Sequence, residues 1–408
     1  MKNKLKLNSA EFGWIDFSAA DMRRTREALA AVSSGSIDEL GISIIRNGFA
    51  EELFPGLSGA QTSPKYLLLI PAMLKKMELE KMLPCLQGDT ENNEGKVFAA
   101  FREKLIAMQC RFCDDACGEQ NPDRENIIGN TTARRTDIPD AKRLVRFPHD
   151  IYWHGLYTFG LVDAPSMTEY VRNMCSRHSR KDDEKKFDLK QYWNRQFPLD
   201  YAAVINSAAG CRPLDLTAPE QEFLLSKIKE AVAGKNTLLE KVITACDEFN
   251  VEKNNVLSIA AALQKVSPSA AQFSIYMRCA FLGFNIACCS HDPQRIEPWL
   301  EEIRLLKGGQ DFNIDFLDET ARRFSYDRKK GHVLAYMKNY FSLLNNSFSP
   351  EKIRQSMIEW EKAAKGNKAY LEKNSSGNDD EWKGMEYLDF RLLTALKLFS
   401  FLRGSTHE

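Results

Sequence analysis

The sequence predicts a mainly α-helical protein. Its N-terminal part is expected to carry a few short strands and a candidate winged helix-turn-helix, and its C-terminal part a helical bundle. Three observations lead to this class. Helix-start signals recur, such as Ser267-Pro268 and Ser349-Pro350, which put proline at the first helical position. Apolar residues repeat at helical spacing, as at Phe98, Phe101 and Leu105. Alternating patterns typical of strands are few.

The first elements lie within residues 1–96, which we expect to form an N-terminal helical region. Phe12–Phe17 is a short extended segment. Ser18-Ala19-Ala20-Asp21 fits a capping box that opens a helix, and Ser36-Ile37-Asp38-Glu39 repeats that signal. The second of these helices should end at Phe54-Pro55-Gly56, and Ser63-Pro64 should open the next one.

Residues 97–176 are predicted to form a helix-turn-helix-like region. Its first helix would be Val97–Cys113, and a short second element would lie at Thr131–Arg135 or at Ala141–Arg146. A second long helix would start at Pro148 and end at Gly160, and Leu161-Val162 would then enter a short strand, the candidate wing.

Residues 177–198 are very polar and carry charges of both signs, so we expect a linker there. Residues 199–408 would then be the C-terminal helical domain. Thr217-Ala218-Pro219-Glu220, Ser267-Pro268 and Ser349-Pro350 each predict a helix start. The apolar run Leu388–Leu402 predicts a last helix that packs back on the core.

The composition limits the class of protein. Lys plus Arg and Asp plus Glu are 56 each, so the net charge is zero and any nucleic-acid contact requires a local basic patch. No secretory signal follows Met1. The most apolar run, Cys279–Cys289, is too short to span a bilayer. The ten cysteines follow no disulfide pattern, so reduced thiols in a cytoplasm are expected, with no membrane partner.

The central stretch is the best candidate for a recognition surface that binds double-stranded DNA. A recognition helix presents side chains of its first turns to base edges, while cations around it hold phosphates. The expected base-edge residues are His149, Asp150, Trp153 and His154. The expected phosphate contacts are Arg134, Arg135, Lys142, Arg143 and Arg146.

A structural interpretation competes with DNA binding. Tyr152, Trp153, Leu156 and Phe159 fit one apolar stripe of a helix that packs into a core, and the arginines would then decorate an ordinary surface. A second basic cluster comprises Arg322, Arg323, Arg328, Lys329, Lys330 and His332, and it is interpreted either as a secondary anion-binding patch or as a charged turn, because acidic residues flank it.

Other chemistry has weaker support. Cys110, Cys113 and Cys117 have helical spacing, but structural zinc sites need four ligands, so we expect neither metal nor cofactor. Gly56-Leu57-Ser58-Gly59-Ala60 misses the nucleophile-elbow pattern by one residue and follows a predicted helix, where the elbow needs a strand. The acidic residues within 182–186 resemble the carboxylates of metal-dependent nucleases only weakly. No catalytic residue is assigned.

Several short motifs together resemble a bacterial family that carries only a domain-of-unknown-function label. They come in the same order as in that family, from Phe12 to the C-terminal end, and comprise Phe12–Phe17, Leu53-Phe54-Pro55-Gly56, Gln61-Thr62 with Tyr66, Ile127-Ile128-Gly129, Pro148 with Ile151-Tyr152-Trp153 and Gly155-Leu156, and Leu388-Asp389-Phe390-Arg391. The cysteine cluster and the polar segment before Pro148 depart from the family. The resemblance implies a bacterial cytoplasmic protein encoded among phage-defence or restriction genes, and it implies no activity.

These expectations combine into a leading hypothesis and two alternatives. The leading hypothesis is a non-enzymatic component of a bacterial anti-phage defence system, which binds DNA through the central stretch or docks on other subunits as an adaptor. The first alternative is a metal-dependent nuclease or other hydrolase from the same context. The second is a pure protein–protein scaffold.

Overall fold

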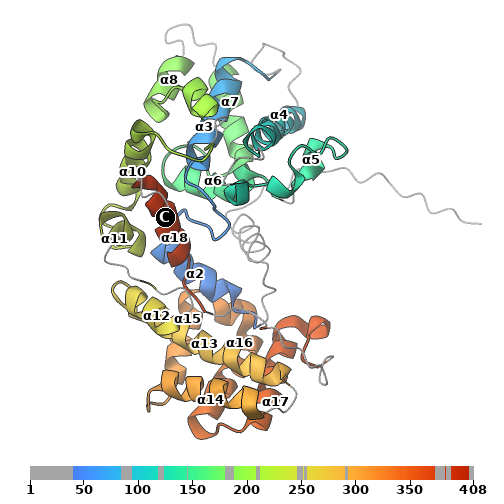
Figure 1. Cartoon of the computed structure of the whole chain (residues 1–408), viewed down its shortest axis with the longest axis vertical. Coiled ribbons are helices and arrows are strands. Elements are labelled where there is room, and N and C mark those ends of the chain that lie inside the picture. The colour runs from blue at the N-terminus through green and yellow to red at the C-terminus, as the bar shows by residue number, and fades with distance from the viewer. Residues whose placement is uncertain are drawn as a thin grey trace, which may run out of the picture.

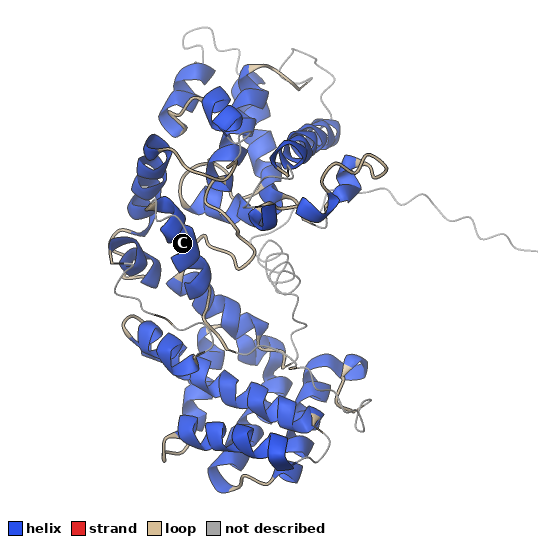
Figure 2. Cartoon of the chain, viewed as in Figure 1, coloured by secondary structure: helices blue, strands red, loops and turns tan. Residues whose placement is uncertain are grey.

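The computed structural model describes residues 40–83, 94–117, 124–144, 146–179, 188–207, 212–245, 251, 255–289, 293–372, 382 and 387–403. Within these ranges the chain forms 17 α-helices, a few short 3₁₀ turns and no strand (Figure 2). The predicted mainly α class is confirmed. The extended segment Phe12–Phe17 and the helix predicted after Ser18 lie outside the described residues.

Two groups of helices lie at opposite ends of an elongated molecule (Figure 1). We call the first the upper body; it comprises α3 (Tyr66–Leu79), α4 (Glu94–Ala116), α5 (Asp140–Arg143), α6 (Pro148–Thr158), α7 (Met167–Ser179), α8 (Leu189–Gln196) and α9 (Tyr201–Ser207). We call the second the lower body; it comprises α12 (Val256–Gln264), α13 (Pro268–Cys288), α14 (Pro293–Lys307), α15 (Ile314–Arg323), α16 (Tyr326–Asn346) and α17 (Pro350–Lys365).

Four helices lie between the two bodies, and we call them the joint (Figure 1). They come from three distant parts of the sequence: α2 (Ser43–Leu53), then α10 (Ala218–Val232) with α11 (Leu238–Thr244), and finally α18 (Leu392–Leu402). The apolar C-terminal segment therefore packs back on the chain, as its composition predicted. Helix α18 packs against both α10 and α11.

Local sequence explains most helix boundaries. The Ser267 hydroxyl accepts a hydrogen bond from the Ala270 amide (3.3 Å), and Pro268 occupies the first turn of α13. The Ser349 hydroxyl does the same for the Lys352 amide (3.4 Å) at the start of α17. A serine cap supplies an acceptor for an amide that has no intrahelical partner, so both predicted starts are confirmed.

The end of α6 confirms one prediction and corrects another. Gly160 has φ +66°, and the Leu161 amide donates to the Leu156 carbonyl (2.8 Å), which is the hydrogen bond of a Schellman cap. The strand predicted at Leu161-Val162 is wrong. Both residues form bends, and both side chains are buried in the protein core. Core packing therefore explains why they are apolar, and no strand pairing is needed.

Helix α13 is the centre of the lower body. It packs against α12, α14 and α17, and most of its residues are buried. The Tyr340 hydroxyl donates to the Cys279 carbonyl (2.7 Å), and the Tyr340 ring lies directly over Gly283, where a side chain would collide with it. The apolar run of this helix is therefore a protein core. No described helix combines the length and apolarity that crossing a bilayer requires.

Residues 177–198 contain ordered helical structure at both ends. Arg177 belongs to α7, and its guanidinium contacts the buried Glu78 carboxylate (3.1 Å) and the Asp163 carboxylate (2.6 Å). Trp193 of α8 is buried, and α8 packs against α3. The described ends of the segment predicted as a linker thus belong to the upper body, because their aromatic and charged side chains have partners there.

Candidate functional site

The predicted base-edge residues of α6 are not all exposed. Trp153 is only 7% exposed; its indole N–H donates to the Ala164 carbonyl (3.1 Å). His149 is 1% exposed, and its Nδ1 lies 2.9 Å from the Gln109 Oε1. The exposure expected for these two side chains is wrong, because α6 packs on more than one side. Burial lowers the pKa of His149 to about 4, although the Asp150 carboxylate acts in the opposite direction.

Carboxylates lie close to three of the predicted phosphate-binding arginines. The buried Arg143 guanidinium pairs with both oxygens of Asp114 and with Asp140 (3.3 Å). Arg135 pairs with Asp137 (2.5 Å). The Arg134 amide donates to Asp114 (2.6 Å), and its Nε donates to the Asp114 carbonyl (3.4 Å). These contacts place acidic groups within the basic patch that the sequence suggested.

The predicted set therefore divides by location. Arg134, Arg135 and Lys142 are exposed, Asp150 is exposed at the start of α6, and Arg146 is half-buried. Arg143, His149 and Trp153 are buried. His154 faces α2 and lies 2.6 Å from a Glu51 oxygen. The three exposed cations all lie between residues 134 and 142, in the segment that precedes α6.

The motif residues of α6 meet the motif residues that precede α3. The Tyr152 hydroxyl accepts from the amides of Thr62 (2.8 Å) and Ser63 (3.0 Å), and it donates to the Ser63 carbonyl (2.8 Å). The Tyr66 hydroxyl accepts from the Ile128 amide (2.9 Å). Two tyrosines thus satisfy the backbone of two loops, so these motifs act together as one packing unit.

Gly155 completes this unit by allowing close approach of two backbones. A Cβ atom at position 155 would lie 2.6 Å from the Gly56 carbonyl oxygen. The Gln61 side chain also donates to that oxygen through its Nε2 (3.3 Å). Gly56 itself has φ +79°, a conformation that side chains disfavour. Both glycines of these motifs are therefore explained by the contact between α6 and the loop after α2.

A polar cluster at the C-terminal end of α2 connects three distant segments. The Glu51 carboxylate lies 2.6 Å from His154 Nε2 of α6, and it accepts from the Arg391 guanidinium (3.3 Å) just before α18. The neighbouring Glu52 accepts both Arg323 Nε (3.2 Å) and NH2 (2.6 Å) from α15. Because a carboxylate oxygen can only accept, His154 Nε2 is the donor of this hydrogen bond. We call these five residues the α2 clamp.

The backbone before α18 is strained where it contributes to the α2 clamp. Phe390 and Arg391 have φ +48° and +78°, in a region that costs a non-glycine residue about 1–3 kcal/mol. The Asp389 carboxylate accepts from the Arg391 (3.3 Å) and Leu393 (3.0 Å) amides and thereby holds this turn. Because of this turn, two consecutive residues point to different partners: Phe390 packs into the core and Arg391 contacts Glu51.

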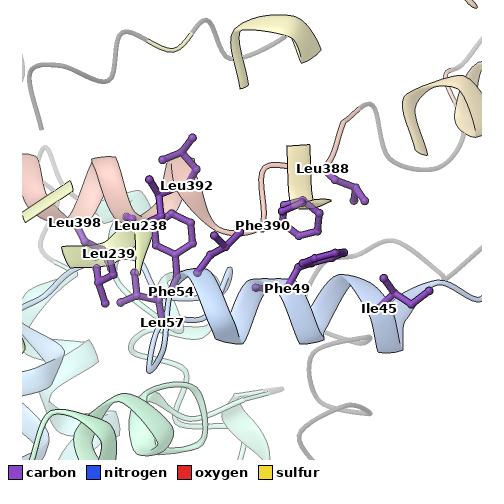
Figure 3. Close-up of a cluster of buried hydrophobic side chains, with 14 of the residues drawn as sticks. Ile45, Phe49, Phe54, Leu57, Leu238, Leu239, Leu388, Phe390, Leu392 and Leu398 are labelled. Atoms are coloured by element: carbon purple, nitrogen blue, oxygen red, sulfur yellow. The ribbon is translucent and has the colours of Figure 1, made fainter. Parts of the chain in front are cut away.

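Apolar side chains pack around α2 in the joint (Figure 3). The Phe49 ring packs against three other rings, with centroid-to-centroid distances of 5.7 Å to Phe273, 4.7 Å to Phe324 and 5.4 Å to Phe390. Figure 3 also places side chains of α11 and α18 around the end of α2, namely Leu238, Leu239, Leu392 and Leu398. Helix α2 is therefore fixed by a buried aromatic cluster on one side and by paired charges at its end.

The charge on Glu51 makes the α2 clamp sensitive to acid. Burial would raise the pKa of Glu51, but His154 and Arg391 outweigh it and hold this pKa below its usual value near 4.5. The carboxylate thus stabilises the fold above its unfolded-state pKa, and this contribution is lost as pH falls through the folded-state value. We expect Glu51→Gln to reduce the loss of stability below about pH 4.5, measured by urea unfolding, whereas Glu103→Gln on α4 should leave it unchanged. Equal acid sensitivity in wild type and Glu51→Gln would contradict this assignment.

The cysteine cluster is part of the upper core. Cys110 and Cys113 of α4 and Cys117, which directly follows that helix, are buried free thiols. Burial raises the pKa of Cys110 to about 11, which keeps that thiol protonated. Among the described residues, no group of three or more His, Cys, Asp or Glu side chains is placed to hold a metal ion.

The other candidate motifs have these locations. Ser58 follows the helix α2 and a turn, whereas a nucleophile elbow needs a strand at that point. Residues 182–186 lie outside the described residues. In the second basic cluster Arg323 belongs to the α2 clamp, the Arg322 Nε donates to the Asp318 carbonyl (3.3 Å), and the Lys330 ammonium contacts the Gly41 carbonyl (3.5 Å). The remaining members, Arg328, Lys329 and His332, are exposed.

Comparison with known proteins adds one finding. A model of a family of unknown function (DUF6361) matches residues 9–84, which is less than a fifth of the chain. The matched segment contains α2, Gly56 and Tyr66, so the resemblance to an uncharacterised family is found over this segment. Searches of curated proteins and of solved structures find no match.

The sequence pattern does not reveal the residues that hold the joint. Glu51, Glu52 and Phe49 lie in an ordinary helix pattern and carry no motif. Arg391 was noted only within the motif at the C-terminal end. One signal was present in the sequence. A motif of the resemblance, Leu53-Phe54-Pro55-Gly56, lies at the end of α2, and another, Leu388-Asp389-Phe390-Arg391, directly precedes α18. The structure brings these two motifs together at the α2 clamp, but the sequence alone does not identify which side chains pair there.

Proposed function

We propose that this protein is a non-enzymatic adaptor that holds two helical bodies in a fixed arrangement so that other proteins can dock on them. The α2 clamp is the observation that supports this proposal most strongly. Adjacent carboxylates of one helix reach the upper body through His154 and the lower body through Arg323. Such an arrangement suits a protein that acts by holding its binding surfaces in a fixed relative position.

Energetics support a rigid connection. Bodies within one chain move relative to each other unless their interface is large and apolar. Here a cluster of buried phenylalanines forms part of the joint, and the paired charges lie at its edge. Exposed ion pairs contribute little individually, so the buried aromatic residues supply most of the stability and the charges set the geometry.

The proposed biological context rests on the resemblance. From it we infer a protein encoded among bacterial phage-defence or restriction genes, and the docking partners would then be other subunits of that system. A winged helix-turn-helix is not needed for this role. The buried positions of His149 and Trp153 favour docking over base recognition by α6.

Binding to double-stranded DNA is the alternative proposal, and one observation favours it. Arg134, Arg135 and Lys142 are exposed within a stretch of nine residues that precedes α6. They would contact phosphates without reading bases, so binding would be independent of sequence. The paired carboxylate of Asp137 reduces the positive charge available for this role.

One experiment separates the adaptor from its alternatives. The purified protein is titrated with a fluorescent duplex at several salt concentrations, and the tagged protein is also isolated from its host with the products of neighbouring genes. The adaptor proposal expects no salt-sensitive duplex binding and a stoichiometric complex with a neighbouring protein.

Two other outcomes would overturn the adaptor proposal. Duplex binding whose salt slope falls by roughly 1.8 in Arg134→Glu plus Arg135→Glu would establish the DNA-binding alternative. Cleavage of plasmid DNA that requires Mg²⁺ or Mn²⁺ would establish the nuclease alternative. A variant with Lys265→Glu plus Lys352→Glu is the matched control, because it reverses the same number of charges at exposed positions of the lower body outside both predicted basic clusters.

A further inference from the structure

A groove of about 470 Å³ opens on the lower body, between α12, α13 and the end of α14. Leu257 and Ala261 of α12 form one side, and Leu306 with Phe312 forms the other. Leu257 is 48% exposed, and among the described residues only two other large hydrophobic side chains are classed as exposed. The groove therefore offers apolar surface that the described part of the chain leaves uncovered.

The floor of the groove is rigid. The Tyr276 hydroxyl accepts from the Asn313 amide (2.7 Å) and from the Gln272 side chain (3.2 Å). The Tyr276 ring also contacts Phe312 (4.9 Å) and Phe341 (5.0 Å). These contacts fix the floor before any partner binds, so little conformational freedom is lost on binding.

The shape of the groove fits a helix. Leu257 and Gln264 lie seven residues apart on α12, so this wall is about 10 Å long, or two helical turns. Small side chains, Ala260, Ala261 and Ala271, let a partner backbone come close. Peptides that add to a sheet edge need an open strand, and the described part of the chain contains none. A helix satisfies its own backbone and needs no such edge.

The charge of the groove lining further limits which kind of partner surface can bind there. Its lining contains only two charged residues, Lys307 and Asp311, and they pair with each other (3.1 Å). The other long polar side chains are the amides of Gln264, Gln272 and Gln310. Such a lining has no cationic cluster for a phosphate and no acidic cluster for a basic peptide. It fits an apolar stripe flanked by uncharged polar side chains.

We propose that this groove binds a short amphipathic helix of a partner protein, about two turns long at the contact, with apolar residues at positions i, i+3 or i+4, and i+7. The proposal rests on the adaptor function and names the surface through which one partner docks. The apolar side chains of that helix would cover Leu257 and Ala261, and its uncharged polar edges would meet the glutamine side chains.

The test uses the full-length protein in its host. A photo-crosslinking amino acid replaces Ala261 within the groove or, as a control, Leu305, which is an exposed leucine of α14 outside the groove lining. We expect at least ten-fold more crosslinked protein from position 261. Peptide mapping should place the crosslink on the apolar face of a helix in the partner.

A second measurement separates the groove from the adaptor function. Leu257→Asp should weaken the affinity for the co-purified partner about ten-fold or more, because a charge then faces the apolar stripe. Leu305→Asp should leave that affinity unchanged, and circular dichroism checks that both variants fold. Full retention of the partner by Leu257→Asp would overturn the groove while the adaptor function stands. Absence of any co-purified partner from wild type would overturn both, and a crosslink from position 261 to nucleic acid or to an extended segment would overturn the groove.

Discussion

Tyr152→Phe is expected to lower the free energy of unfolding by about 2–4 kcal/mol. The hydroxyl that it removes serves the amides of Thr62 and Ser63 and the Ser63 carbonyl. The ring of phenylalanine fills the same space, so packing is retained while these backbone groups lose their partner. A buried donor without a partner costs about 1–3 kcal/mol; the Ser63 amide becomes such a donor, and the half-buried Thr62 amide also loses its partner. Urea unfolding followed by circular dichroism measures the change.

Tyr157→Phe is the matched control for this prediction. Tyr157 lies on the same helix and is exposed, so its hydroxyl is solvated by water in both the folded and the unfolded protein. We expect a change within about 0.5 kcal/mol there. If Tyr152→Phe were as mild as Tyr157→Phe, the motif around α6 would not be held by this hydroxyl, and its role as a packing unit would fall.

Gly155→Ala is the second substitution with a large expected effect. The new Cβ would lie 2.6 Å from the Gly56 carbonyl oxygen, a backbone atom that cannot rotate away. Either α6 or the loop after α2 must shift, and we expect a destabilisation of about 1–3 kcal/mol, as for other overpacked sites. The shift would also move His154 away from Glu51, because His154 is the neighbour of Gly155 on α6.

Gly331→Ala on α16 controls for the chemistry of this substitution. A Cβ at position 331 would meet no atom within 4 Å and the backbone there has no positive φ, so alanine should stabilise by about 0.4–1 kcal/mol by lowering the entropy of the unfolded chain. We therefore expect opposite signs for the two glycine substitutions, measured by thermal unfolding at the same pH. Stabilisation by Gly155→Ala would contradict the close approach of the two backbones.

The sequence predicted the helices of the fold well, because their signals are local. Ser267-Pro268, Ser349-Pro350 and Gly160 each act on their own turn, so a few neighbouring residues suffice to place a boundary. The strand at Leu161-Val162 was wrong for a related reason. A short apolar pair fits a strand and a buried bend equally well, and only its distant packing partners decide between them.

The site was harder to predict, because its contacts join residues far apart in the sequence. The aromatic and basic residues near α6 were conspicuous, but their orientation depends on helices α3, α4 and α7 that surround them. Trp153 faces Tyr170 (5.7 Å), and Arg143 faces Asp114, and neither pairing follows from helical periodicity. The contact between Glu51 and Arg391 spans 340 positions of the chain and has no local signature at all.

The most direct test of the account is the distance between the two bodies in solution. Genetically encoded spin labels at the exposed Lys190 of α8 and Leu305 of α14 would report it by pulsed electron paramagnetic resonance, with every cysteine left in place. We predict one narrow distance distribution in the wild-type protein and a clearly broader one after Phe49→Ala, which removes the ring that contacts Phe273, Phe324 and Phe390. A broad distribution in the wild-type protein, equal to that of the variant, would show that α2 does not hold the bodies together.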